Sequence, residues 1–209
     1  MYRRTLIKAL FGLALGFAVL PAMARAEPSV DQAGKFVTVL ANNAITMVAD
    51  KSLNESERDD RFRKLFVANF DIPTIGKFVL ARYWRVATPE QRGEFLKLFE
   101  DQQVLTWAHR FKDYSGERLQ VAGGERENAH EWLINSQITR IKGPPIPVQW
   151  RLRDEPDGSY RVTDLIVEGV SMAITQRSDY ASVLQGMSGQ IDQLLSSMRT
   201  KIDQMKAAG

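Results

Sequence analysis

The 209-residue chain contains no cysteine and only two histidines, His109 and His130. The lack of cysteine excludes disulfides, thiolate zinc sites, cysteine nucleophiles and a lipid-modified cysteine anchor. The two histidines fall on different expected elements, and neither has a second histidine at metal-ligand spacing. A hydrophobic fraction of 44% with 25% charged residues is typical of a globular domain and excludes disordered and collagen-like chains.

Motifs for catalysis are also missing. Residues 186–189 (Gly-Met-Ser-Gly) lack the G-x-S-x-G pattern of a nucleophile elbow, and no glycine-rich phosphate loop is present. Asp154 and Asp157 share a predicted turn, where Asp is favoured for backbone reasons. Asp164 and Glu168 interrupt an apolar strand; we interpret them as a solvent-facing edge, with a shared cavity wall as the alternative. We therefore expect no enzyme, no metal and no cofactor.

The first 26 residues have the pattern of a cleaved export signal. Arg3, Arg4 and Lys8 precede an uncharged stretch that ends in Ala-Arg-Ala at 24–26, which fits an A-x-A cleavage site. The stretch is interrupted by Pro21 and is shorter than the roughly 20 apolar residues of a membrane span. Export by the Sec route is expected, with the twin-arginine route as the alternative that the adjacent arginines suggest.

The charge of the whole chain, +3, comes from the expected signal. This segment contains four basic and no acidic residues, so the expected mature domain, residues 27–209, carries 24 basic and 25 acidic residues. Its net charge of −1 removes the bulk electrostatic argument for nucleic acid as a partner. Because no linker or repeat divides this part of the chain, we expect it to form a single domain.

The first half of the mature chain is predicted to be helical. Helix starts are expected at Ser29, Asn54, Asp71 and Thr88, which are capping residues followed by apolar residues at helical spacing. In three of them a Glu or Gln stands three residues after the cap. The last helix is expected to run to about Tyr114. Its apolar residues change face half-way, which indicates different neighbours along its length or a bend.

From Glu117 onward apolar residues recur at every second position, which predicts four antiparallel strands. A polar connector beginning at Gly123-Gly124 separates the first two strands, and a hairpin loop at 154–158 separates the last two. The last strand is expected to run from residue 160 to residue 172, and helices return from Ser178. The order predicts an α+β fold: a helical N-terminal half, a four-stranded twisted antiparallel sheet and C-terminal helices.

Bulky apolar side chains are abundant, and they include four tryptophans. Core packing explains most of them, but a twisted sheet backed by helices can also leave an apolar pocket between the two. The candidates for lining such a pocket are alternate residues of the last two strands and two helical aromatic residues. They are Val148, Trp150, Leu152, Val162, Ile166, Val170, Met172, Phe99 and Tyr83. Arg151 and Arg153 alternate with them and are expected to meet solvent or a partner.

Two segments resemble the MlaC family, which comprises periplasmic phospholipid-binding proteins also called toluene-tolerance proteins. The first contains Gly-Lys-Phe-Val-Leu at 76–80 and Tyr-Trp-Arg-Val-Ala-Thr-Pro-Glu-Gln-Arg-Gly-Glu-Phe at 83–95. The second contains Val-Gln-Trp-Arg-Leu at 148–152 and Val-Glu-Gly-Val-Ser at 167–171. The resemblance extends over most of residues 29–205. Ala81 departs from it, because Gly commonly stands there, and we expect this to be a tight packing position.

The resemblance implies a carrier with phospholipid as cargo and no cofactor. Such proteins hold acyl chains in an apolar pocket and shuttle lipid across the periplasm. Their partners are an outer-membrane lipoprotein complex and an inner-membrane ABC transporter with its lipid-binding subunit, and their role is to maintain outer-membrane lipid asymmetry. The alternatives are a carrier of another lipid such as a hopanoid, a ligand-free periplasmic adaptor with an exposed docking patch, and a small esterase.

Overall fold

The structure is a computed structural model of the chain and describes residues 29–50, 52–112, 114, 116–140 and 142–208. The expected export signal, residues 1–26, lies outside this part. Within the described ranges, no helix combines the length and the apolar character that a membrane span requires.

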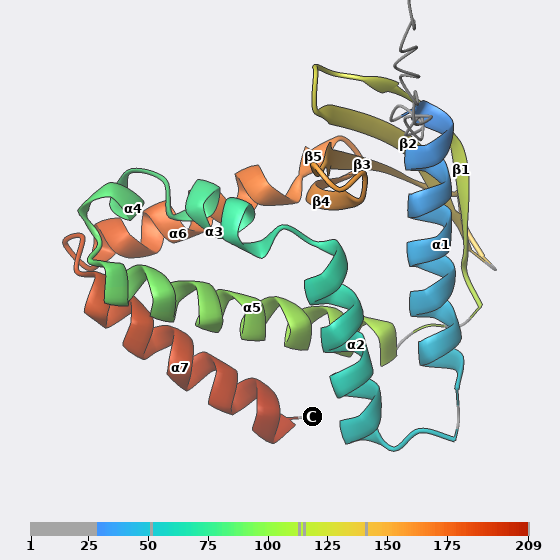
Figure 1. The fold of residues 1–209 in the computed structure, drawn as a ribbon. Helices are drawn as coiled ribbons and strands as arrows, with labels where there is room; N and C mark the ends of the chain where they lie inside the picture. Colours follow the sequence, from blue (N-terminus) through green and yellow to red (C-terminus); the bar gives the residue numbers. More distant parts are fainter. Residues whose placement is uncertain (1–28, 51, 113, 115, 141, 209) are drawn as a thin grey trace, which may run out of the picture.

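Helices flank a sheet in the order that the sequence predicts, so the α+β fold is confirmed (Figure 1). The helices are α1 (Val30–Ala49), α2 (Glu55–Asn69), α3 (Ile72–Leu80), α4 (Arg82–Val86), α5 (Pro89–Lys112), α6 (Met172–Gly186) and α7 (Ile191–Ala208). The strands are β1 (Arg118–Arg126), β2 (Glu131–Thr139), β3 (Ile146–Asp154), β4 (Tyr160–Val167) and β5 (Val170–Ser171). The short α4 and the two-residue β5 were not predicted.

The predicted helix starts are confirmed by their capping hydrogen bonds. At the start of α2, the Asn54 Oδ1 atom accepts from the Glu57 N–H at 2.9 Å, and Glu57 Oε2 accepts from the Asn54 N–H at 3.1 Å. Thr88 and Gln91 form the same reciprocal pair before α5, at 3.2 and 3.0 Å. The predicted caps of α1 and α3 are also present. Each cap satisfies N–H groups that the first turn of a helix leaves without partners.

Two apolar cores divide the molecule. The helical core contains buried residues from each of the helices α2 through α7, and the sheet core contains buried residues from α1 and from strands β2, β3 and β4. Figure 1 shows α1 lying along the sheet, with α3 to α7 on the other side of the molecule and α2 between them. Phe70 and Trp107 pack against both cores.

The change of apolar face along α5 follows from this division. Near its start, Phe95 and Phe99 are fully buried in the helical core. Near its end, Trp107 reaches the sheet core as well. The interpretation that α5 has different neighbours along its length is therefore the one that the structure supports.

The sheet is an antiparallel meander in the order β1-β2-β3-β4-β5. Gly123 and Gly124 lie inside β1, so the prediction of a connector at these residues is wrong. The β1–β2 register shifts between Val121 and Gly123, and Gly123 has a φ of 107°, as expected of a bulge. A Cβ atom on Gly124 would clash with the Leu133 carbonyl oxygen of β2. Glycine is needed at position 124 because the backbones of β1 and β2 approach closely. Since glycine occurs both in turns and at bulges of strands, the residue type alone does not show which of the two it forms.

The last long strand ends earlier than predicted. β4 stops at Val167, and Glu168 and Gly169 form a tight turn with φ angles of 51° and 81°. Two consecutive positive φ angles are typical of a type I′ hairpin turn, which folds β5 back onto β4. The prediction of a continuous strand to residue 172 is therefore wrong. The prediction that helices return from Ser178 is also wrong, because α6 begins at Met172.

Asp164 holds the start of α6 in place. Its Oδ1 atom accepts a hydrogen bond from the Ala173 N–H at 2.9 Å, and its Oδ2 atom accepts from the Ser171 hydroxyl. The residue is only 6% exposed, so the solvent-facing interpretation of this carboxylate is wrong. A buried carboxylate is tolerated here because it accepts hydrogen bonds from the Ala173 N–H and the Ser171 hydroxyl, and because its negative charge lies at the positive end of the helix dipole.

Ala81, between α3 and α4, has a φ of 52° and a ψ of −123°. An L-residue adopts such a backbone conformation at a cost, whereas glycine adopts it freely, so backbone conformation explains why glycine suits this position. We expect Ala81→Gly to raise the free energy of unfolding by about 1 kcal/mol, measured by urea denaturation. Ala87→Gly is the control, since Ala87 has an ordinary φ of −66° and is expected to lose stability. A loss of stability in both variants would contradict the prediction.

Candidate functional site

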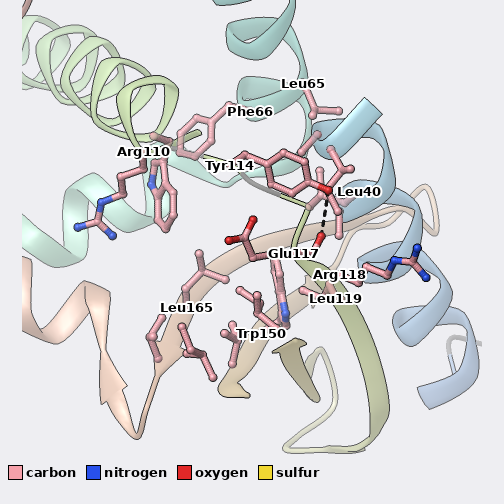
Figure 2. A pocket seen from close by; sticks show the side chains of 18 of the residues that line it. Leu40, Leu65, Phe66, Arg110, Tyr114, Glu117, Arg118, Leu119, Trp150 and Leu165 are labelled. Carbon is pink, nitrogen blue, oxygen red and sulfur yellow. Dashed lines mark hydrogen bonds between the residues drawn. The ribbon is translucent and has the colours of Figure 1, made fainter. Parts of the chain in front are cut away.

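An apolar cavity of about 300 Å³ lies between the sheet and helices α1, α2 and α5, and it is partly open to the surface (Figure 2). Sixteen of its twenty lining residues are apolar. These are Leu40, Ala41, Ala44, Ile45, Phe62, Leu65, Phe66, Phe70, Trp107, Leu119, Ile138, Ile146, Val148, Trp150, Leu165 and Val167. A concave, largely apolar pocket with a few polar groups is the usual form of a small-molecule site.

The space exists because α1 presents small residues toward the sheet. Ala41 and Ala44 line the cavity on α1, next to Leu40 and Ile45. An alanine side chain ends at Cβ, so these positions leave room that larger residues would fill at the usual packing density of an interior. The opposite wall comes from the sheet, where strands β1 to β4 all contribute apolar residues.

Trp150 is held rigidly in the sheet wall. Its indole N–H donates to the Ser136 hydroxyl at 3.0 Å, and that hydroxyl donates to the Val148 carbonyl oxygen at 2.8 Å. The polar atom of the ring is therefore satisfied inside the protein. The ring can offer apolar surface to the cavity without leaving an unpaired N–H group.

A bulge in β4 decides which of its residues face the cavity. Val162 pairs with Leu152 and Asp164 pairs with Arg151, so Thr163 is an extra residue on β4. An extra residue reverses the alternation of side chains beyond it. Counting every second residue from Val162 therefore leads to the wrong face after residue 163.

Beyond the bulge, Leu165 pairs with Trp150 and Val167 pairs with Val148, and all four line the cavity. Ile166 pairs with Gln149 and points to the other face of the sheet. Leu165 and Val167 are thus cavity residues that strand alternation does not identify.

Of the nine residues predicted from the sequence, the structure places Val148 and Trp150 in the lining of this cavity. Leu152 and Val162 are fully buried in the sheet core and are not part of that lining. Tyr83 is buried in the helical core.

The other predicted residues lie elsewhere. Val170 is 52% exposed at the β4–β5 turn. Phe99 and Met172 line a second, smaller cavity of about 80 Å³. Its lining includes polar groups, among them Gln103 and Gln176, which are joined by a hydrogen bond of 2.9 Å. Polar walls make this space less suitable for a hydrocarbon chain than the larger cavity.

None of the cavity-lining residues on α1 and α2 was predicted. Leu40 and Ala44 have the i, i+4 spacing of one helix face, so the sequence does contain a signal. The same spacing describes a helix packed on a solid core, and Leu40 and Ala44 are indeed nearly buried, at 6% and 8% exposed. Periodicity identifies the face of the helix but not the empty space beneath it.

Arg151 and Arg153 engage carboxylates of the chain itself. Arg151 donates to Glu127 at 2.8 Å and lies 3.5 Å from Asp164, and Arg153 forms ion pairs with Asp71 and Glu155. Both arginine side chains remain about one-third exposed. Across the described ranges, no three His, Asp or Glu side chains are grouped so that they could hold a metal ion.

The chain is similar in sequence to proteins of phospholipid transport. The family model described as MlaC protein matches residues 39–200. The chain is 24% identical, over 198 residues, to the intermembrane phospholipid transport system binding protein MlaC of Haemophilus influenzae. This match covers 89% of this chain and 90% of that protein. It is 22% identical, over 150 residues, to the toluene tolerance protein ttg2D of Pseudomonas putida, and this match covers 71% of this chain and 69% of that protein.

The fold is similar to that of the phospholipid-binding protein from Ralstonia solanacearum, whose structure was solved in complex with a phospholipid. The TM-score is 0.72 at 17% sequence identity, and the match covers 83% of this chain and 98% of the other. The structural likeness supports the fold, and the family model spans well over half of the chain. The chain belongs to the MlaC family.

Proposed function

We propose that this protein is a periplasmic carrier that holds the acyl chains of a phospholipid in the cavity between α1, α2, α5 and the sheet. The observation that supports this most strongly is the composition of the cavity wall, which is apolar at sixteen of twenty residues. The relative named for phospholipid transport and the phospholipid bound to a protein of similar fold point to the same class of ligand.

The energetics suit a carrier. Burying an acyl chain is worth about 0.8 kcal/mol per CH₂ group, in a bilayer or in a protein pocket. The free energy of moving a phospholipid from a membrane into the protein is therefore close to zero. The transfer makes and breaks no covalent bond. We propose that docking partners set the direction, with an outer-membrane complex at one end and an inner-membrane ABC transporter at the other. A binding protein without catalytic activity meets these requirements.

The location follows from the expected export signal at residues 1–26. Cleavage after Ala26 would release residues 27–209 into the periplasm, where a lipid carrier between two membranes has to work. The described part of the chain begins after this segment.

A vesicle transfer assay tests the proposed function. Donor vesicles carry a fluorescent phospholipid with a quencher, and acceptor vesicles carry neither. We expect the purified chain to speed the transfer in proportion to its concentration, with the lipid recovered chemically intact. No acceleration, or recovery of hydrolysed lipid, would contradict a carrier function.

A further inference from the structure

Exposed apolar side chains gather on α3, α4, β5 and α6. In the described part of the chain six large apolar residues are exposed, and five of them belong to these four elements. The five are Phe78, Val86, Val170, Ile174 and Val183. In Figure 1 the helices α3, α4 and α6 lie on one side of α5, and α7 lies on the other. Single exposed apolar residues are ordinary, whereas a cluster of them is typical of an interaction surface.

Basic side chains stand among these apolar residues where α3 meets α6. The guanidinium carbon of Arg177 on α6 lies 5.0 Å from the centroid of the Phe78 ring on α3, and this ring is 39% exposed. Ile174 is 57% exposed and stands three residues before Arg177, on the same side of α6. Lys77, the neighbour of Phe78 in α3, is exposed as well. We call Lys77, Phe78, Ile174 and Arg177 the basic–apolar face.

The positive charges of the basic–apolar face are not neutralised by the chain itself. Arg151 in the sheet pairs with carboxylates, but none of the ion pairs among the described residues includes Lys77 or Arg177. Residues 72–87, which form α3 and α4, contain three basic residues and no acidic one. Asp179 stands two positions after Arg177 in α6, so it points to another side of that helix. The face therefore suits a partner of negative charge.

We propose that the basic–apolar face docks the protein on a membrane surface that contains anionic phospholipid. This inference rests on the proposed function, because a carrier that exchanges lipid with a membrane has to reach its surface. Each lysine or arginine near an anionic bilayer raises the affinity about fivefold. Phe78 and Ile174 enter the boundary between headgroups and acyl chains, where exposed apolar side chains leave water.

The form of the basic–apolar face favours a membrane over an acidic protein. Protein interfaces depend on anchor residues that fill pockets, and none of the four residues lines any of the three cavities between the described elements. A bilayer has no fixed shape to match and requires only exposed basic and apolar side chains. The four residues are also absent from the wall of the lipid cavity, so docking can be measured apart from lipid binding.

Co-flotation with vesicles tests this inference. The exported form of the chain is used, so that the basic and apolar residues of the expected signal do not contribute. One set of vesicles contains phosphatidylcholine alone, and the other contains phosphatidylcholine and phosphatidylglycerol in equal amounts. The wild type should bind the anionic vesicles about tenfold more tightly than the neutral ones, and added salt should weaken this binding.

Variants of the face and matched variants elsewhere locate the docking surface. Lys77→Gln should weaken binding to the anionic vesicles about fivefold, and Ile174→Ser should weaken it by about the same factor. Lys201→Gln removes the same charge from an exposed position on α7. Val39→Ser removes an apolar residue of α1 that is also 57% exposed. Both control variants should bind like the wild type.

Three results would count against the proposals, and they are distinguishable. Equal binding to the two kinds of vesicle, or equal losses in the face variants and the controls, would overturn the docking surface. A wild-type chain that contains phospholipid but binds neither kind of vesicle would overturn the docking surface and leave the carrier function standing. A chain that binds anionic vesicles through this face but neither contains nor transfers phospholipid would overturn the carrier function instead.

Discussion

Replacing Ala44 by tryptophan is expected to remove lipid from the protein while leaving its fold intact. Ala44 lies on α1 with its side chain in the cavity wall. An indole at this position enters a cavity of about 300 Å³, so it has space that a close-packed core would not offer. It would occupy the volume that the acyl chains need. We expect at least tenfold less phospholipid per chain, measured by mass spectrometry of the extracted lipid.

The matched control for this prediction is Val39→Trp. Val39 lies on the same helix, is 57% exposed and is absent from the cavity wall. It should bind lipid like the wild type, and both variants should keep the circular dichroism of the native fold. If Ala44→Trp retained a full complement of lipid with a native spectrum, the ligand would have to bind elsewhere.

Replacing Phe99 by alanine is expected to lower the free energy of unfolding by about 3–5 kcal/mol, as for other buried phenylalanines. Phe99 is fully buried, its ring stacks on Phe95 at 5.7 Å between centroids, and it meets the Tyr180 ring edge-on at 6.1 Å. Phe99→Leu keeps most of the volume and should cost about 1 kcal/mol. Urea denaturation of the three proteins measures both effects.

The ionisation of Tyr180 gives a second measurement of the same substitution. Burial raises the pKa of Tyr180 well above its usual value of 10.0. Removing the Phe99 ring should let water approach the phenol and lower this pKa toward the usual value, which absorbance at alkaline pH detects. An unchanged stability and an unchanged titration of Tyr180 would contradict the placement of Phe99 in the helical core.

The local signals in the sequence were sufficient for the starts of α1, α2, α3 and α5, although not for the short α4. A capping side chain and its partner lie three residues apart, so Asn54 with Glu57 and Thr88 with Gln91 could be identified without knowing any distant contact. The end of β4 depended on the turn at Glu168 and Gly169, and a glycine after an apolar run does not reveal by itself whether the strand continues.

The cavity was harder to predict for a physical reason. The extra residue at Thr163 reverses the face of Leu165 and Val167, and a bulge leaves no mark in the alternation of apolar residues. The helix wall was missed because a residue beside an empty space and a residue in a solid core have the same apolar character. Only the arrangement of α1 against the sheet separates the two cases.

Mass spectrometry of the lipid extracted from the purified chain tests the proposed function most directly. A carrier with this cavity should contain a stoichiometric amount of intact phospholipid. A chain recovered without lipid, whose crystal structure showed side chains filling the space between α1 and the sheet, would contradict the proposal.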